Sequence, residues 1–332
     1  MQRRTFLKYA GVLPASAWLD SFDASGAAPT GRFKLGVISD EFSQDFEEAL
    51  RTMRGFGLQW VEIRTVWGVY NTEATPQQLQ RIKDLLNKYD FRVSVVDTAL
   101  YKCNLPGTAN VLKEKDAYPY SKQMELLERA IERGQALGTD KLRVFAFWRV
   151  ARPRDYYPRI AEELTKAAEV AQQAGLRLVL EDESSSNVGS GRELADMLKL
   201  VPAANLGANW DVGNGYWNGE VSFPTGYAAL DKKRIWHMHL KDVRCGARAA
   251  AQEKAEAFRK KGARVTESSK CQTAIVGAGQ VDLAGQFRAL ARDGYDGTMS
   301  LEPEYEAPGI SHFEATRRSL EGLLKIMAGA VA

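Results

Sequence analysis

Four stretches in the second half of the chain each begin as a short apolar run and end on a carboxylate or an imidazole. They read LRLVLEDE, LGANWD, IWHMHLKD and GTMSLEPE, and the residues at issue are Glu181, Asp211, His239 and Glu302. The runs have the length of strands and look buried on both faces, as the strands of a parallel barrel are. In such a barrel the carboxyl ends of all strands meet at one rim. We therefore expect these four side chains to gather there.

The spacing along the chain fits this arrangement. Glu181 and Asp211 are 30 residues apart and Asp211 and His239 are 28 apart, each about one strand plus one helix. The 63-residue step from His239 to Glu302 is too long for one such unit. It contains a charged, Ala-rich segment at 244–275, which we interpret as an insertion, a solvated helical excursion over the rim.

The rest of the chain alternates strand-like and helix-like segments. Further strands are predicted at 34–39, 58–64, 91–97 and 141–147, and helices at 45–56, 75–89, 118–137, 155–174 and 312–327. Eight strands, each followed by a helical stretch, predict an α/β fold: one (β/α)8 TIM barrel over residues 33–330. It is expected to be a single domain with the insertion after strand seven.

Residues 1–28 have the pattern of an export signal. Arg3 and Arg4 form a twin-arginine pair, residues 9–19 are a short apolar core, and small residues follow at 24–28. The core is shorter than the roughly 20 residues that cross a bilayer, so we expect no stable membrane anchoring of the mature protein. The predicted location is the periplasm, reached by the twin-arginine route.

The charge balance disfavours nucleic acids and anionic membranes as partners, and the cysteine spacing disfavours a zinc site made of cysteines. With 45 basic and 42 acidic residues, the chain has no excess charge of the kind that binds nucleic acid or anionic membranes. Cys103, Cys245 and Cys271 match no zinc pattern and are expected to be thiols. Cys245 and Cys271 flank the insertion, so a disulfide between them in an oxidising periplasm is the alternative. The oligomeric state stays open, a homo-oligomer included.

A shared cation explains the four strand ends better than four separate roles do. A single acid after a strand usually caps a helix or faces solvent. Four at successive strands would lie near a dry interior, where unpaired carboxylates cost several kcal/mol. Three carboxylates, one imidazole and no thiolate favour Mn²⁺ or Mg²⁺, with Co²⁺ or Zn²⁺ as alternatives.

Five motifs resemble those of a known family, the xylose-isomerase-like TIM barrels of sugar (phosphate) isomerases and epimerases. They are LEDE at 180–183, DVGN at 211–214, HMHLKD at 237–242, GAGQVD at 277–282 and GYDGTMSLE at 294–302. The resemblance implies that Glu181, Asp211, His239 and Glu302 bind the metal. It also implies that Glu181 and Glu302 are the catalytic pair, one removing the proton beside a metal-bound carbonyl and the other returning it through a cis-enediolate.

Substrate contacts are expected from polar and aromatic residues near the same rim. The candidates are Asn214, His237, Lys241, Glu183, Trp148 and Arg149. Asn214 and Glu183 stand where the family often has histidine, so its sugar specificity does not carry over. His237 competes with His239 as the ligand, and Lys241 alternatively pairs with Asp242. Weaker rim candidates are Asp40, Glu41, Glu62, Arg64 and Asp97.

Three functions follow, in order. The first is a divalent-metal-dependent isomerase or epimerase of a non-phosphorylated sugar or keto-sugar. The second is a metal-dependent lyase or hydrolase acting on 3-keto-glycosides by β-elimination. The third is a sugar-binding protein without catalysis. A DNA-repair phosphodiesterase with a histidine-rich multi-zinc site is disfavoured, because the chain has 3 histidines in total.

Overall fold

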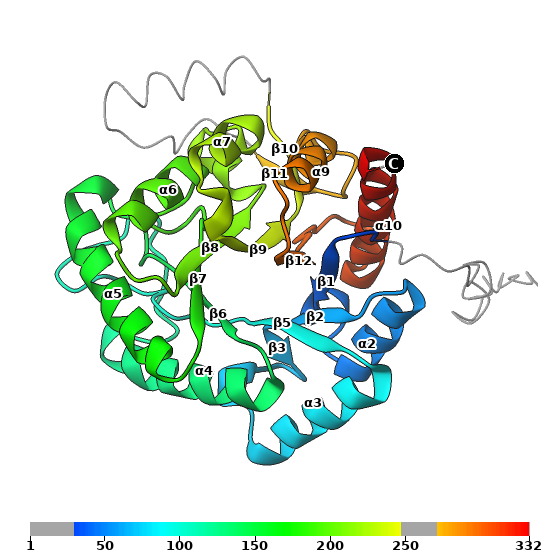
Figure 1. The fold of residues 1–332 in the computed structure, drawn as a ribbon, viewed down its shortest axis with the longest axis horizontal. Coiled ribbons are helices and arrows are strands. Elements are labelled where there is room, and N and C mark those ends of the chain that lie inside the picture. The colour runs from blue at the N-terminus through cyan, green and yellow to red at the C-terminus, as the bar shows by residue number, and fades with distance from the viewer. Residues whose placement is uncertain (1–29, 247–270, 332) are drawn as a thin grey trace, which may run out of the picture.

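Eight parallel strands close into a barrel in the computed structural model, which describes residues 30–246 and 271–331. Around the barrel the order is β1, β12, β9, β8, β7, β6, β5, β2 (Figure 1). The strands are β1 Lys34–Ile38, β2 Trp60–Ile63, β5 Arg92–Val96, β6 Lys141–Val144, β7 Arg177–Glu181, β8 Leu206–Asp211, β9 Ile235–Leu240 and β12 Thr298–Leu301. The predicted (β/α)8 TIM barrel is confirmed.

Helices form a ring outside the strands (Figure 1). The longer ones are α2 Phe46–Gly55, α3 Pro76–Tyr89, α4 Gln123–Leu137, α5 Tyr157–Gln173, α6 Gly191–Leu200, α9 Leu283–Arg292 and α10 His312–Val331, and the short ones are α1 Ser39–Phe42 and α7 Tyr227–Ala229. Local signals set their ends. Thr75 and Gln78 form a capping box at the start of α3, with Pro76 in its first turn. Gly138, with φ of 72°, ends α4.

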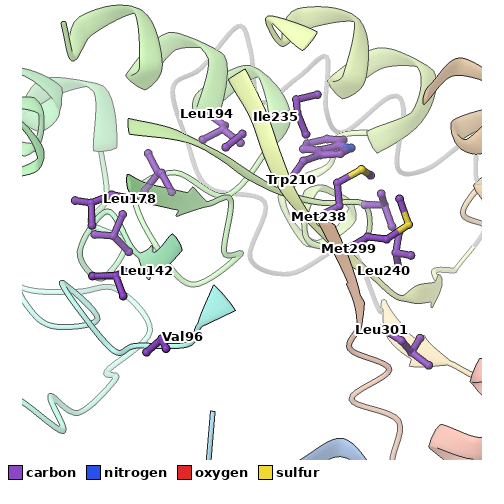
Figure 2. Close-up of a cluster of buried hydrophobic side chains, with 14 of the residues drawn as sticks. Val96, Leu142, Leu178, Leu194, Trp210, Ile235, Met238, Leu240, Met299 and Leu301 are labelled. Atoms are coloured by element: carbon purple, nitrogen blue, oxygen red, sulfur yellow. The ribbon is translucent and has the colours of Figure 1, made fainter. Parts of the chain in front are cut away.

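Polar and apolar residues alternate along the barrel strands. Met238 and Leu240 of β9 lie beside Met299 and Leu301 of β12 in the apolar layer between barrel and helices (Figure 2). His237 directly precedes Met238 in sequence and points to the other face of the strand, where its ring contacts Glu62 of β2. Because β2 and β9 are not neighbours in the barrel order, that contact crosses the lumen. The prediction that these strands are buried on both faces is confirmed: one face packs under the helices, and the other lines a polar lumen.

The segment after β9 begins and ends as a two-stranded ribbon. β10 Asp242–Arg244 pairs antiparallel with β11 Gln272–Ala274, and a disulfide joins Cys245 to Cys271 next to it. The two cysteines were expected to be thiols, and the alternative of a disulfide is the one the structure has. Cys103 is a buried free thiol. The remainder of the predicted insertion, 247–270, lies outside the described residues, so its expected helix is untested.

Another ribbon, β3 Thr65–Val66 with β4 Val69–Tyr70, lies beyond β2 and contributes to the carboxyl-terminal rim. Within the described part of the chain, none of the helices has both the length and the apolar content that crossing a bilayer requires. The predicted signal at 1–28 lies outside the described residues.

Candidate metal centre

The four strand-end residues converge at one place on the rim. Each of Glu181, Asp211, His239 and Glu302 offers one ligand atom, and these atoms all lie within 4.8 Å of one another. Glu181 ends β7, Asp211 ends β8, His239 lies on β9 and Glu302 directly follows β12. These strands are neighbours in the barrel, which is why residues spread over the second half of the chain meet. All four side chains are buried.

The donor atoms fit a hard divalent cation. Glu181 Oε2, Asp211 Oδ2 and Glu302 Oε2 are buried, and none makes a hydrogen bond of acceptable geometry. His239 Nδ1 lies 3.3 Å from Glu181 Oε1 and 3.1 Å from Glu302 Oε2, so one imidazole nitrogen faces the same point. Three carboxylates, one imidazole and no thiolate suit Mg²⁺ or Mn²⁺. One shared ion would bind all three of these oxygens, which lack hydrogen bonds, at once.

Three basic side chains also approach these carboxylates. Lys241 Nζ lies 3.2 Å from Asp211 Oδ2 and 3.0 Å from Glu302 Oε2, distances of ion pairs that lack hydrogen-bond geometry. Arg143 of β6 lies 3.0 Å from Glu181 Oε2. Arg64 Nη1 donates to Glu302 Oε1 at 2.9 Å. Each of the two glutamates of the centre is thus paired with an arginine, Glu181 with Arg143 and Glu302 with Arg64.

Burial and the nearby positively charged side chains shift the pKa values of two carboxyl groups of the site, Glu302 and Asp211. Burial raises the pKa of Glu302, but Lys241, His239 and Arg64 outweigh it and hold the pKa well below its usual range. For Asp211 burial wins over the nearby Lys241, and its pKa rises to about 6. Glu302 and Asp211 therefore differ in their affinity for protons, with Glu302 the more firmly ionised of the two.

A cavity of about 290 Å³ opens beside the centre. It is lined by Arg64, Tyr70, Ala99, Lys102, Glu114, Lys115, Ala117, Arg143, Trp148, Glu183, Glu302 and Glu304. Trp148 and Glu183 were candidate substrate contacts and line it. Trp148 Nε1 donates to Asp116 Oδ1 at 2.9 Å, so the indole is held in place.

Lys241 and Asn214 are close to the centre in different ways. Lys241 is buried against Asp211, Glu302 and Glu304, so the alternative pairing with Asp242 was wrong. Asp242 instead accepts backbone N–H groups from the segment that follows β11, Gly277 and Gly279 among them. The Asn214 backbone N–H donates to Asp211 Oδ1 at 2.8 Å.

Two candidates lie away from the cavity. The Arg149 guanidinium makes a two-pronged ion pair with Glu193 of α6 and also donates to the Ser186 carbonyl, so it joins the segment after β6 to the segment after β7 and to α6. The His237 ring is deeper in the lumen, held by Glu62 and Thr298. Neither is brought to the substrate side, and His239 rather than His237 is the imidazole of the centre.

Arg143, Lys102 and Tyr70 were not found by sequence reasoning. Arg143 lies within β6, whose sequence KLRV alternates basic and apolar residues. That alternation is the signal that could have found it, because it puts Arg143 on the lumen side while Leu142 packs under the helices. Lys102 lies on an irregular segment and Tyr70 on the two-residue strand β4, so neither left such a signal.

Comparisons with known proteins agree with this architecture. The inosose dehydratase of Yersinia enterocolitica is 28% identical over 160 residues, which are 48% of this chain and 51% of that protein. The chain thus spans about half the length of the curated relatives it matches.

Two solved structures have the same fold. The IOLI protein with a bound zinc atom superposes with a TM-score of 0.67 at 15% identity, and the match covers 90% of this chain and 100% of that one. The 3-keto-D-glucoside 4-epimerase from E. coli superposes with a TM-score of 0.61 at 14% identity, over 88% of this chain and 99% of that one. The family model described as xylose isomerase-like TIM barrel matches residues 50–326. The chain therefore belongs to the xylose isomerase-like TIM barrel family.

Proposed function

We propose that this protein is a divalent-metal-dependent isomerase or epimerase of a non-phosphorylated sugar or keto-sugar. The observation that carries the proposal is the position of Glu181 and Glu302. They come from β7 and from the end of β12, on either side of β8 and β9, and both contact Nδ1 of His239. If a substrate carbonyl binds at the cation position between them, one carboxylate can remove a proton from the neighbouring carbon and the other can return it.

A divalent cation bound at this centre would polarise a substrate carbonyl and acidify the neighbouring C–H. Glu181 and Glu302 then act as the two bases, one for each face of the substrate. Arg143 and Arg64 orient their carboxylates through ion pairs of 3.0 Å and 2.9 Å. Lys241, in contact with Glu302, is placed to donate to a substrate oxygen on that side.

The cavity suits a neutral sugar. Its lining has four cations, Arg64, Lys102, Lys115 and Arg143, and four carboxylates, Glu114, Glu183, Glu302 and Glu304. Without an excess of either sign, the lining offers many hydrogen bonds and no field that selects a phosphate. The apolar face of Trp148 offers a surface for sugar C–H groups. Export by the expected signal supports the same substrate class, because phosphorylated sugars are scarce outside the cytoplasm.

Elimination is the second candidate, and the inosose dehydratase relatives favour it. Removal of the same proton starts both reactions. They differ in whether the second acid returns the proton to carbon or protonates a leaving oxygen on the neighbouring carbon. A 3-keto-glycoside would lose its aglycone by that route.

The test is proton exchange in D₂O with the metal-reconstituted mature protein and a panel of ketoses and 3-keto-glycosides. We expect the NMR signal of a proton beside the carbonyl to disappear, with an isomer formed. Release of an aglycone would instead support elimination. Glu181→Gln should abolish exchange, whereas Glu169→Gln, on the exposed side of α5, should leave it unchanged. Full activity after complete metal removal would contradict both functions.

A further inference from the structure

We infer that Glu62 is a positioning residue that orients His239 and fixes which of its nitrogens faces the metal centre. Glu62 is fully buried on β2 and is not one of the four residues of the centre, which are Glu181, Asp211, His239 and Glu302. The inference rests on the proposed function only in that it takes the four-residue centre as a cation site.

The two nitrogens of His239 face opposite ways. Nε2 lies 3.1 Å from Glu62 Oε1 and 3.2 Å from Glu62 Oε2. Nδ1 lies 3.3 Å from Glu181 Oε1 and 3.1 Å from Glu302 Oε2. One edge of the ring is therefore turned to a buried carboxylate, and the other edge to the cation position.

This arrangement determines the tautomer. An ionised carboxylate only accepts hydrogen bonds, so the proton of a neutral His239 ring belongs on Nε2. Nδ1 is then left with a free lone pair for the cation. The Asn209 amide lies between the two ring nitrogens and nearer to Nε2, with Nδ2 3.2 Å from Nε2 and 3.5 Å from Nδ1. Half a turn of that amide presents Oδ1, which is buried without a partner, to the same N–H.

Glu62 is itself held in place. His237 Nε2 lies 2.8 Å from Glu62 Oε2, and His237 Nδ1 lies 2.7 Å from Thr298 Oγ1. A chain of polar groups thus runs through the lumen from β12 to the centre: Thr298, His237, Glu62, His239. In this chain of contacts His237 holds Glu62 in place, a role that needs no contact with the metal or the substrate. This role also explains why β9 has two histidines on one face.

A second cation among Glu62, His237 and His239 is the competing interpretation, because their ligand atoms also lie within 4.8 Å of one another. Hydrogen bonds argue against it. Both histidines already contact Glu62 through Nε2, at 2.8 Å from His237 and 3.1 to 3.2 Å from His239, distances at which each Nε2 is satisfied without an ion. The two interpretations differ in stoichiometry, one bound ion per chain against two.

The first experiment compares Mn²⁺ binding by calorimetry in the metal-stripped wild type, in Glu62→Gln and in Glu220→Gln. Glu220 is a matched control, a buried glutamate that caps the start of α6 away from the centre. Removing a carboxylate that holds a metal-binding histidine typically weakens affinity 10- to 100-fold. We expect a loss of about that size in Glu62→Gln, none in Glu220→Gln, and one ion per wild-type chain. A visible-spectrum change of Co²⁺-loaded Glu62→Gln should accompany the weaker binding.

Unchanged Mn²⁺ affinity in folded Glu62→Gln would overturn the inference while leaving the proposed function standing. Two ions per wild-type chain, one of them lost in the variant, would overturn it in favour of the second cation. A wild type that binds no divalent ion would contradict both the inference and the proposed function.

The second experiment needs no variant and decides the matter if Glu62→Gln does not fold. In Zn²⁺-loaded wild type with ¹⁵N-labelled histidine, long-range ¹H–¹⁵N correlation spectra identify the protonated nitrogen of each ring. The chain has 3 histidines, so assignment is simple. We expect His239 to carry its proton on Nε2 and to bind zinc through Nδ1. A proton on Nδ1, or zinc bound through Nε2, would overturn the inference.

Discussion

The ammonium of Lys241 lies 3.0 Å from Oε2 of Glu302, one of the two carboxylates proposed as bases. The two residues follow neighbouring strands, β9 and β12, and both side chains are buried. Burial lowers the pKa of Lys241, but Asp211, Glu302 and Glu304 outweigh it and hold the pKa well above its usual range. A permanent positive charge therefore lies beside the cation position.

Lys241→Met should separate metal binding from turnover. The change removes the Lys241 ammonium, which has the same sign of charge as the cation, from beside Asp211 and Glu302. Mn²⁺ should therefore bind roughly tenfold more tightly, a gain in binding free energy of about 1.4 kcal/mol. Turnover should fall, because the same ammonium is the proposed donor to a substrate oxygen. Calorimetry and a proton-exchange assay measure the two effects, with Lys166→Met on the exposed face of α5 as control. A variant with weaker metal binding and full turnover would contradict this role.

Arg143 and Arg149 form a natural pair for mutation, because both are buried but only Arg143 contacts the centre. Arg143→Lys keeps the charge but loses the planar fork, and we expect kcat to fall roughly 10- to 100-fold. Arg149→Lys should lower stability by about 1 to 2 kcal/mol through its weakened contact with Glu193 and leave kcat near the wild-type value. Steady-state kinetics and urea unfolding distinguish the two. Equal kinetic effects would show that Arg149 acts at the site after all.

His312 and Glu41 predict a pH-dependent contribution to stability. The hydrogen bond to Glu41, with Nε2 3.1 Å from Oε2, raises the pKa of His312 against the effect of burial. A pKa raised on folding stabilises the folded state fully below the unfolded pKa, about 6.5, and the gain is lost as pH rises through the folded value. His312→Asn should therefore cost more unfolding free energy at pH 6 than at pH 9. Urea unfolding at both values tests it, and an equal cost at both would contradict the pair.

The disulfide predicts a thiol count and a stability change. Denatured, unreduced protein should give one reactive thiol, that of Cys103, and reduced protein three. A bridge across a sequence separation of 26 stabilises by about 3 to 4 kcal/mol in the chain-entropy model. Thermal unfolding with and without reductant should show a lower Tm after reduction. Three reactive thiols before reduction would contradict the bridge.

How much could be predicted from sequence depended on where a residue stands on its strand. Glu181, Asp211 and Glu302 close apolar runs, and a carboxylate at that place is conspicuous in the sequence. Their convergence followed from the rule that parallel strands end at one rim. The boundaries were less accurate: β6 ends at Val144, before the predicted 147, and Phe147 has φ of 60°, which a strand does not allow.

Residues within the lumen could not be placed in the same way. Glu62 stands inside β2, where a polar residue signifies either the lumen or an exposed edge. The choice depends on register across strands distant in sequence, such as β2 and β9, and a single sequence does not give it. Arg149 illustrates the reverse error. It follows the predicted strand 141–147 much as Glu302 follows its strand, but its guanidinium turns to Glu193.

The central claim is that Glu181, Asp211, His239 and Glu302 hold one divalent cation, and an anomalous difference map of Mn²⁺-soaked crystals tests it most directly. We predict a single strong peak per chain at the rim, bonded to a carboxylate oxygen from each of the three acids and to Nδ1 of His239. No peak among these four side chains, or a peak bonded to Glu62 and His237 instead, would contradict it.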